Sequence, residues 1–299
     1  MRAWYSDPYE VPLPEGHRFP MAKYRLVREV LLARGVLAPE QLELAQPVDE
    51  ATLAVVHDRA YLRACFEGTL DEAALRRIGF PWSEALLERS LASAGGTLSA
   101  ARHALVHGVG GNLAGGTHHA HADFGSGYCV FNDLAVAAAT LLREGAVERV
   151  LVVDLDVHQG DGTAAIFRSE PRVFTFSMHG AKNFPFRKQV STRDVELPDG
   201  CDDARYLGLL DEHLPEVFEA SAPSLVLYQA GVDALKEDTL GRLHLSHEGL
   251  RARDRRVFDL CWSRAVPVVV TLGGGYARPI DATVEASVGT WVELRRRFG

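Results

Sequence analysis

Cysteine is scarce in this sequence, with four residues of this type among 299. Cys65, Cys129, Cys201 and Cys261 are far apart and form no CxxC pair. This spacing argues against a zinc ribbon and against a disulfide framework. We therefore expect four reduced thiols that are buried in the protein.

The sequence also lacks a long hydrophobic run. The longest apolar runs, such as LAVAAATLL, have about nine residues, whereas a membrane-spanning helix needs about 20. The opening segment, MRAWYSDPYE, has no apolar stretch of the kind found in signal peptides. We expect a soluble, cytoplasmic protein with no membrane partner.

An excess of basic residues is missing as well. Lys and Arg number 32 against 40 Asp and Glu, so the formal net charge is -8. A general nucleic-acid-binding protein would normally present a basic face, so no direct nucleic-acid partner is expected. The acidic balance favours a cationic or neutral partner, and the composition leaves the oligomeric state open.

No linker rich in Pro, Gly or Ser divides the chain, and there is no internal repeat, so we expect one domain over residues 1–299. Between helical patterns lie short β-branched runs that are apolar continuously and not at every second residue. Such runs predict an α/β protein with a parallel sheet covered by helices on both faces. The predicted strands span 149–156, 172–179, 224–231, 267–275 and, as a further candidate, 3–6. The predicted helices lie near 21–34, 84–106, 133–144, 203–220, 247–264 and 280–297.

Polar residues follow the later predicted strands at their carboxyl ends. In open α/β sheets, ligands bind in the crevice beyond these ends, so the polar groups are expected to converge on one rim. They are Asp154, Asp156 and His158 at the end of the first of these strands, Ser177 and His179 at the end of the second, Asp233 at the end of the third, and Gly273 to Tyr276 at the end of the fourth.

The segment DLDVHQGDGT (154–163) has the spacing of a metal site. Asp154, Asp156 and His158 would project to one side if the strand continues that far. An Asp-x-His pair is a plausible pair of metal ligands, and Asp233 in QAGVDAL is the best candidate for a third. Three such ligands leave coordination positions open for water, as in catalytic zinc sites.

The second unusual segment is GGNLAGGTHHAHADFGSGYCVFND (110–133). Its adjacent histidines, His118 and His119, are candidates for surface residues, further metal ligands, or a paired acid and base. Its glycines do not form a phosphate-binding loop, because Gly116 stands where such a loop has its lysine. The GxGxxG pattern of a dinucleotide site is also absent.

Together these residues resemble a known family. GGTHHA, GYCVFND, DLDVHQGDGT, AGVDAL and LGGGY occur in the order found in histone deacetylases and in their bacterial relatives, the acetoin-utilisation-type proteins and acetylpolyamine amidohydrolases. The resemblance spans 17–290, and HRFPMAKY and DTLGRLHLSHEGL look most like the class IV branch and its bacterial cousins. It implies the three-layer α/β/α sandwich of the arginase/deacetylase fold with a mainly parallel sheet.

The resemblance also implies a role for individual residues. It makes Asp156, His158 and Asp233 the ligands of a zinc ion, for which ferrous iron is the alternative. It also implies a monovalent cation such as K⁺, held largely by backbone carbonyls near the strand that begins at Val150. The tandem pair is His118 with Asp154 and His119 with Asp161, in which His119 would transfer protons and His118 would be an oriented or positively charged neighbour.

The resemblance also implies which residues contact the substrate. Tyr276 matches the tyrosine that polarises the acyl carbonyl, and Gly127 and Tyr128 match the wall of a narrow acyl-lysine channel. Gly274 and Gly275 would let the backbone approach the substrate closely. In the loop HGAKNFPFRKQ, which lacks the class I pattern PGFFPGTG, either Phe184 or Phe186 lines the channel. Tyr128 stands where many members have Phe, and no counterpart of the acidic rim residue of class I enzymes is identified.

The implied activity is metal-dependent removal of acyl groups, above all acetyl, from lysine side chains, with an acyl-lysine protein or an acylated small amine as the partner. Acetylpolyamines, other small amides and long-chain acyl-lysines are alternative substrates. A two-metal ureohydrolase of the arginase kind would need further aspartates, as in DxHxD and DxDxxD. Gly160 stands at the expected acidic position of the first pattern, and Asp233 is followed by Ala234 and Leu235. A non-catalytic acyl-lysine binding module is the alternative from another class, although every expected catalytic residue is present.

Overall fold

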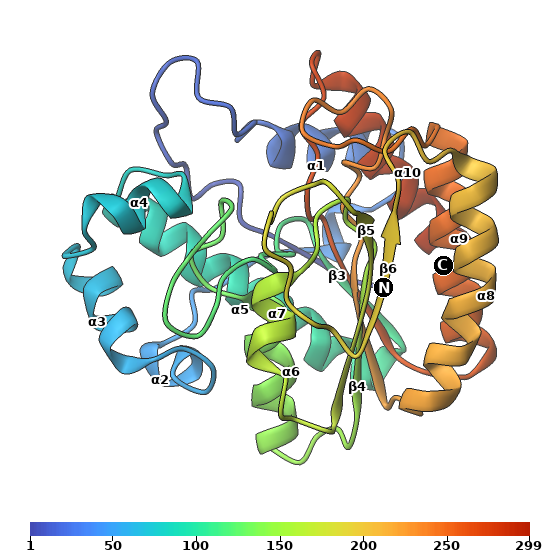
Figure 1. Cartoon of the computed structure of the whole chain (residues 1–299), viewed down its shortest axis with the longest axis horizontal. Coiled ribbons are helices and arrows are strands. Elements are labelled where there is room, and N and C mark those ends of the chain that lie inside the picture. The colour runs from blue at the N-terminus through green and yellow to red at the C-terminus, as the bar shows by residue number, and fades with distance from the viewer.

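Eight strands form one sheet in the computed structural model, which describes residues 1–299 (Figure 1). All seven strand pairs are parallel, in the order β2-β1-β3-β8-β7-β4-β5-β6. The predicted α/β fold with a parallel sheet is therefore confirmed. The strands are β1 (Ala3–Tyr5), β2 (Leu42–Leu44), β3 (Val109–Asn112), β4 (Val150–Asp154), β5 (Val173–Gly180), β6 (Arg193–Leu197), β7 (Leu225–Gln229) and β8 (Val268–Thr271).

Helices cover both faces of this sheet (Figure 1). Along β4, Val150 and Val152 belong to a core of 20 buried residues shared with α5 and α6, while Leu151 and Val153 belong to a core of 56 on the opposite face, beside α8 and α9. Both faces are buried, which explains why the strands are apolar continuously. The helices are α1 (Lys23–Ala33), α2 (Glu50–Leu53), α3 (Arg59–Glu67), α4 (Glu72–Ile78), α5 (Glu84–His107), α6 (Asp133–Arg143), α7 (Asp161–Ile166), α8 (Asp203–Ser221), α9 (His247–Ser263) and α10 (Asp281–Phe298), with a 3₁₀ turn at Pro39–Gln41.

The six predicted helices and the five predicted strands are all present, but shorter elements were missed. Strand β3 has the sequence VGGN, and glycine is depleted in strands. Its glycines are needed because α5 and α10 pack closely: a Cβ on Gly110 would lie 2.4 Å from the carbonyl oxygen of Ala100, and one on Gly111 would lie 2.4 Å from the Trp291 ring. None of the helices combines the length and apolar character needed to cross a membrane.

The carboxyl end of β4 differs from the prediction. The strand ends at Asp154, so Asp156 and His158 lie in the following loop and do not continue an extended alternation. The loop turns because the Asp154 side chain accepts a hydrogen bond from the Asp156 backbone N–H (3.2 Å), and Asp156 accepts one from the His158 N–H (3.0 Å). Short polar side chains that bond to nearby backbone in this way compete with continued strand geometry.

Candidate active site

Three buried side chains meet where the loops after β4 and β7 come together. Nδ1 of His158 lies 3.0 Å from Oδ1 of Asp156 and 3.0 Å from Oδ2 of Asp233. One possible ligand atom from each residue lies within 4.8 Å of the other two. The structure therefore brings together the three residues that were predicted as metal ligands.

The two carboxylates are oriented by hydrogen bonds to their outer oxygens. Oδ2 of Asp156 accepts from Nε2 of Gln229 (2.8 Å) and from the backbone N–H of Gly274 (2.9 Å). Oδ1 of Asp233 accepts from the backbone N–H of Val157 (2.8 Å). The remaining oxygen of each carboxylate thus points at His158. Gln229 was not predicted, although it is the polar residue at the end of the buried strand VLYQ.

The charges in this cluster favour a bound cation. Burial and the neighbouring Asp156 carboxylate raise the pKa of Asp233 to about 7. Burial lowers the pKa of His158, but the carboxylates of Asp233 and Asp156 outweigh it and raise this pKa to about 10. The apoprotein therefore holds a proton among these groups, and a divalent ion would take its place. Two carboxylate oxygens and one imidazole nitrogen suit zinc or ferrous iron, so these residues fit such an ion.

Two adjacent histidines lie beside the cluster, each paired with its own carboxylate. Nδ1 of His118 is 2.6 Å from Oδ2 of Asp154, and Nδ1 of His119 is 2.6 Å from Oδ1 of Asp161. The two imidazole rings lie 4.1 Å apart, centre to centre. Asp161 is the first residue of α7, and its second oxygen lies 3.1 Å from Nε2 of His121, a partner to which sequence reasoning gave no role.

The two histidines differ in charge. Burial lowers the pKa of His118, but Asp154 and Asp156 outweigh it and raise this pKa to about 9. Burial and the charge of His118 lower the pKa of His119 to about 4, against the opposing effect of Asp161. In the absence of a metal ion, these shifts favour a protonated His118 and a neutral His119 at neutral pH. Because the Asp161 carboxylate accepts from Nδ1 of His119, the lone pair of this ring is on Nε2.

Tyr276 follows a run of three glycines after β8. Its backbone N–H donates to Oδ2 of Asp238 (2.6 Å), and its ring centre lies 6.5 Å from that of His158. Burial raises the pKa of its phenol well above the usual value, and the carboxylates of Asp233 and Asp156 add to this effect. The hydroxyl therefore stays protonated and can donate a hydrogen bond.

The glycines before Tyr276 are required by close packing against neighbouring side chains. A Cβ on Gly274 would lie 2.0 Å from Oδ2 of Asp233, and one on Gly275 would lie 2.6 Å from the Thr283 side chain. The segment is also tied to α1, because Nζ of Lys23 donates to the carbonyl oxygen of Gly273 (2.9 Å). Lys23 is buried, and sequence reasoning assigned it no function.

A cavity of about 360 Å³ opens to the surface beside His119, His158 and Tyr276. Gly127 forms part of its wall with φ +54°, and a Cβ there would lie 2.6 Å from the His119 ring. The ring of Phe184 stands edge-on to that of His119, 4.9 Å away, whereas Phe186 is 84% exposed. Phe184 thus lies deep in the channel and Phe186 lies at its entrance. The sequence alone had left open which of the two lines the channel.

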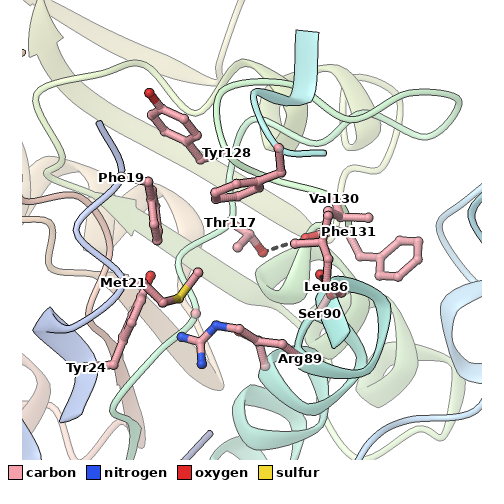
Figure 2. A pocket seen from close by; sticks show the side chains of 13 residues that line it. Phe19, Met21, Tyr24, Leu86, Arg89, Ser90, Thr117, Tyr128, Val130 and Phe131 are labelled. Atoms are coloured by element: carbon pink, nitrogen blue, oxygen red, sulfur yellow. Dashed lines mark hydrogen bonds between the residues drawn. The ribbon is translucent and has the colours of Figure 1, made fainter. Parts of the chain in front are cut away.

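Smaller cavities lie behind the Tyr128 side of the channel. One of about 40 Å³ touches the metal-ligand cluster, and one of about 50 Å³ extends it toward α5, with Phe19, Tyr24 and Tyr128 among the residues lining both. Figure 2 shows the second cavity, with the Arg89 side chain reaching toward Tyr24. The guanidinium lies 4.3 Å from the centre of the Tyr24 ring and donates to the carbonyl oxygen of Ser6 (2.8 Å). Arg89 therefore forms part of the wall of this cavity, where its contacts with Ser6 and Tyr24 hold it.

Comparison with known proteins agrees with this geometry. Residues 17–291 match the family model of the histone deacetylase domain. An uncharacterized protein of Picosynechococcus is 49% identical, with 94% of this chain and 93% of that protein covered. Histone deacetylase 2 of Arabidopsis thaliana is 29% identical, with 95% and 76% covered. The crystal structure of an HDAC homolog complexed with SAHA has a TM-score of 0.84 at 25% identity and covers 99% of this chain and 84% of its own. The chain therefore belongs to the histone deacetylase family and has the arginase/deacetylase fold.

Proposed function

We propose that this protein is a metal-dependent amidohydrolase that removes acetyl groups from lysine side chains. The observation that carries the proposal is the buried cluster of Asp156, His158 and Asp233 beside a neutral His119 oriented by Asp161. A cavity of about 360 Å³ leads to these groups from the surface, which is the arrangement needed to present an amide on a long stem. Membership of the histone deacetylase family supports the same activity.

In this proposal Asp156, His158 and Asp233 hold a zinc ion, with ferrous iron as the alternative. The ion would supply positive charge that makes a water molecule more acidic and polarises the amide carbonyl. The hydrogen bonds from Gln229 and Gly274 to Asp156 keep the ligand oxygens in place.

His119 acts as the general base and then as the general acid. Its Nε2 lone pair accepts a proton from the attacking water, and the resulting imidazolium gives that proton to the leaving amine. Such proton transfer contributes about 10²–10⁴-fold in rate. Asp161 fixes the ring and the tautomer through its bond to Nδ1.

Tyr276 and His118 stabilise charge. The protonated phenol of Tyr276 donates to the oxygen of the amide as negative charge develops there, and an oxyanion donor of this kind is typically worth about 10²–10³-fold. His118, protonated through Asp154, adds a positive charge next to His119. That charge keeps His119 neutral and therefore able to accept a proton.

The geometry favours one metal over two. A second metal of the ureohydrolase kind would need an acidic residue at position 160. A Cβ on Gly160 would lie 2.3 Å from Oδ2 of Asp154 and 3.2 Å from the His118 side chain, so this position has no room for a carboxylate. Asp154 and His118 occupy the space in which such a ligand would stand.

The test is hydrolysis of a matched panel by protein reconstituted with one equivalent of zinc and by the same protein after chelation. The panel holds an acetyl-lysine peptide, a myristoyl-lysine peptide and N-acetylputrescine. We expect metal-dependent release of acetate from the acetyl-lysine peptide. Preferential hydrolysis of the myristoyl peptide or of N-acetylputrescine would assign the site to defatty-acylation or to polyamine deacetylation. No turnover of any of the three, with metal bound, would favour an acyl-lysine binding module.

A further inference from the structure

The mouth of the channel is positively charged. Arg76, Arg77, Lys182 and Arg242 line the 360 Å³ cavity, and no Asp or Glu is among the residues that line it. We call these four side chains the cationic mouth. The chain as a whole has a net charge of -8, so its overall acidity does not describe the surface that a substrate meets first.

The backbone that carries two of these side chains is tied to the channel wall. Arg76 and Arg77 lie in the last turn of α4, whose end is hydrogen-bonded to the glycine turn of the wall. The backbone N–H of Gly127 donates to the carbonyl oxygen of Arg77 (3.1 Å), and that of Tyr128 donates to Ile78 (2.7 Å). The backbone from which both arginines project is therefore held against the channel wall, while their side chains extend into solvent.

The other two cations share a single carboxylate. Nζ of Lys182 lies 3.8 Å from Oδ2 of Asp199, and Nη1 of Arg242 lies 3.4 Å from the same oxygen. Their side chains are 73% and 52% exposed. One carboxylate cannot neutralise two cations, so this side of the mouth keeps a positive charge. Both side chains are mobile enough to reach an incoming anion.

The ion pair on the α4 side is weak. Arg76 pairs with Glu72 at 3.0 Å, but the two side chains are 71% and 89% exposed. Exposed pairs of this kind contribute little and exchange easily with other partners. The carboxylate of a bound substrate can therefore replace Glu72 at small cost. The mouth as a whole would attract anions and repel cations over about a Debye length, roughly 10 Å at 0.1 M salt.

We propose that the cationic mouth selects acyl-lysine substrates that carry aspartate or glutamate within a few residues of the acylated lysine. The same charge disfavours acylated polyamines, because the positive charge of their free amine would be repelled by the cationic mouth. This inference rests on the proposed deacylase function and adds a substrate class to it. The catalytic residues would process any acetyl-lysine, and the mouth would decide which sequences reach them.

The test compares three acetyl-lysine peptides of equal length whose flanking residues are acidic, neutral or basic. For the wild-type protein with zinc at low salt, we expect kcat/KM for the acidic peptide to exceed that for the basic peptide on the order of tenfold, mostly through KM. The double variant Arg76→Glu, Arg242→Glu should reduce this ratio to about one or invert it. Equal kcat/KM for the acidic and basic peptides in the wild type would overturn the inference.

The single variant Arg242→Glu should lower the ratio of acidic to basic peptide, and its matched control, with the same change in net charge, is Arg102→Glu. Arg102 is 53% exposed and pairs with one carboxylate, Glu144, much as Arg242 is 52% exposed and pairs with Asp199, but Arg102 does not line the channel. This control should keep the wild-type ratio of acidic to basic peptide. If Arg102→Glu lowers the ratio as much as Arg242→Glu does, net charge and not the mouth sets the preference, and the inference is overturned.

Binding separates this inference from the proposed function. If no peptide is turned over, the affinities of the acidic and basic peptides for His119→Ala can still be compared by fluorescence anisotropy. Tighter binding of the acidic peptide supports the cationic mouth without any hydrolysis, and equal binding rejects it. Turnover of all three peptides at equal rates would reject the mouth while leaving the deacylase function in place.

Discussion

The floor of the channel, formed by Asp156, His158 and Asp233, and its cationic mouth are built in opposite ways. At the floor, Asp156 is 1% exposed and Asp233 0%, and both are held by backbone and side-chain hydrogen bonds. At the mouth, the side chains of Arg76 and Lys182 are more than 70% exposed and pair loosely with single carboxylates. The floor gathers carboxylates that could hold a cation, whereas the mouth is positive and could hold an anion.

This contrast follows from what each region has to do. Bond cleavage needs charges placed to a fraction of an ångström, and preorganised groups in a buried site are worth most there. Choosing a substrate needs only an attractive field around the entrance, which exposed and flexible side chains provide. Changes at the floor should therefore abolish the reaction, and changes at the mouth should only redirect it.

The largest effect is expected from removing a metal ligand. Asp233→Ala should lose stoichiometric zinc and all measurable turnover, because two of the three ligands cannot hold the ion tightly. Metal content after dialysis and peptide hydrolysis measure this, with circular dichroism to show that the fold persists. Asp199→Ala, a carboxylate removed at the mouth, should keep its metal. Retention of one zinc per chain in Asp233→Ala would exclude Asp233 as a ligand.

Next in size are the groups that act on the substrate. His119→Ala and Tyr276→Phe should each lower kcat by about 10²-fold or more, because each removes a positioned proton-transfer or oxyanion group. Zinc content should stay at the wild-type value in both. If either variant retained more than about a tenth of the wild-type kcat, the role assigned to that residue would be wrong.

A smaller effect is expected where a residue acts through His119. In Asp161→Asn an amide can replace the carboxylate beside Nδ1, and its N–H would favour the tautomer with the proton on Nε2. That tautomer has no lone pair to accept a proton from water, so kcat should fall on the order of 10²-fold while KM changes little. The tautomer itself can be read from imidazole nitrogen NMR shifts. An unchanged tautomer with an unchanged kcat would contradict this account of Asp161.

The smallest effect concerns salt. Raising the ionic strength from about 0.05 to 0.5 M should shrink the preference for acidic over basic peptides several-fold, because exposed charges are screened. Hydrolysis of the neutral peptide and the zinc content should change much less, since the floor is buried. A preference that is insensitive to salt would show that something other than the cationic mouth produces it.

The residues at the floor could be predicted from the sequence, but those at the mouth could not, and the reason is topological. Asp156, His158 and Asp233 come directly after predicted strands, and parallel strands end at one edge of the sheet. Lys23 and Gln229 were missed because their contacts depend on how α1 and β7 pack against the segment after β8. Their sequence neighbourhoods give no sign of those contacts.

No sequence motif predicts the cationic mouth. Its members come from α4 and from two loops far apart in the chain, and α4 itself was not predicted. The negative net charge even favoured a cationic partner. The missed strand β3 has a similar cause, because its glycines serve the close approach of α5 and α10, which no local propensity can show.

The central claim is that one metal ion at Asp156, His158 and Asp233 supports amide hydrolysis. The most direct test is to titrate metal-free protein with zinc while following hydrolysis of an acetyl-lysine peptide. We predict that activity rises from nearly zero and reaches its plateau at one equivalent of zinc per chain. A plateau at two equivalents, or full turnover before any metal is added, would contradict this account.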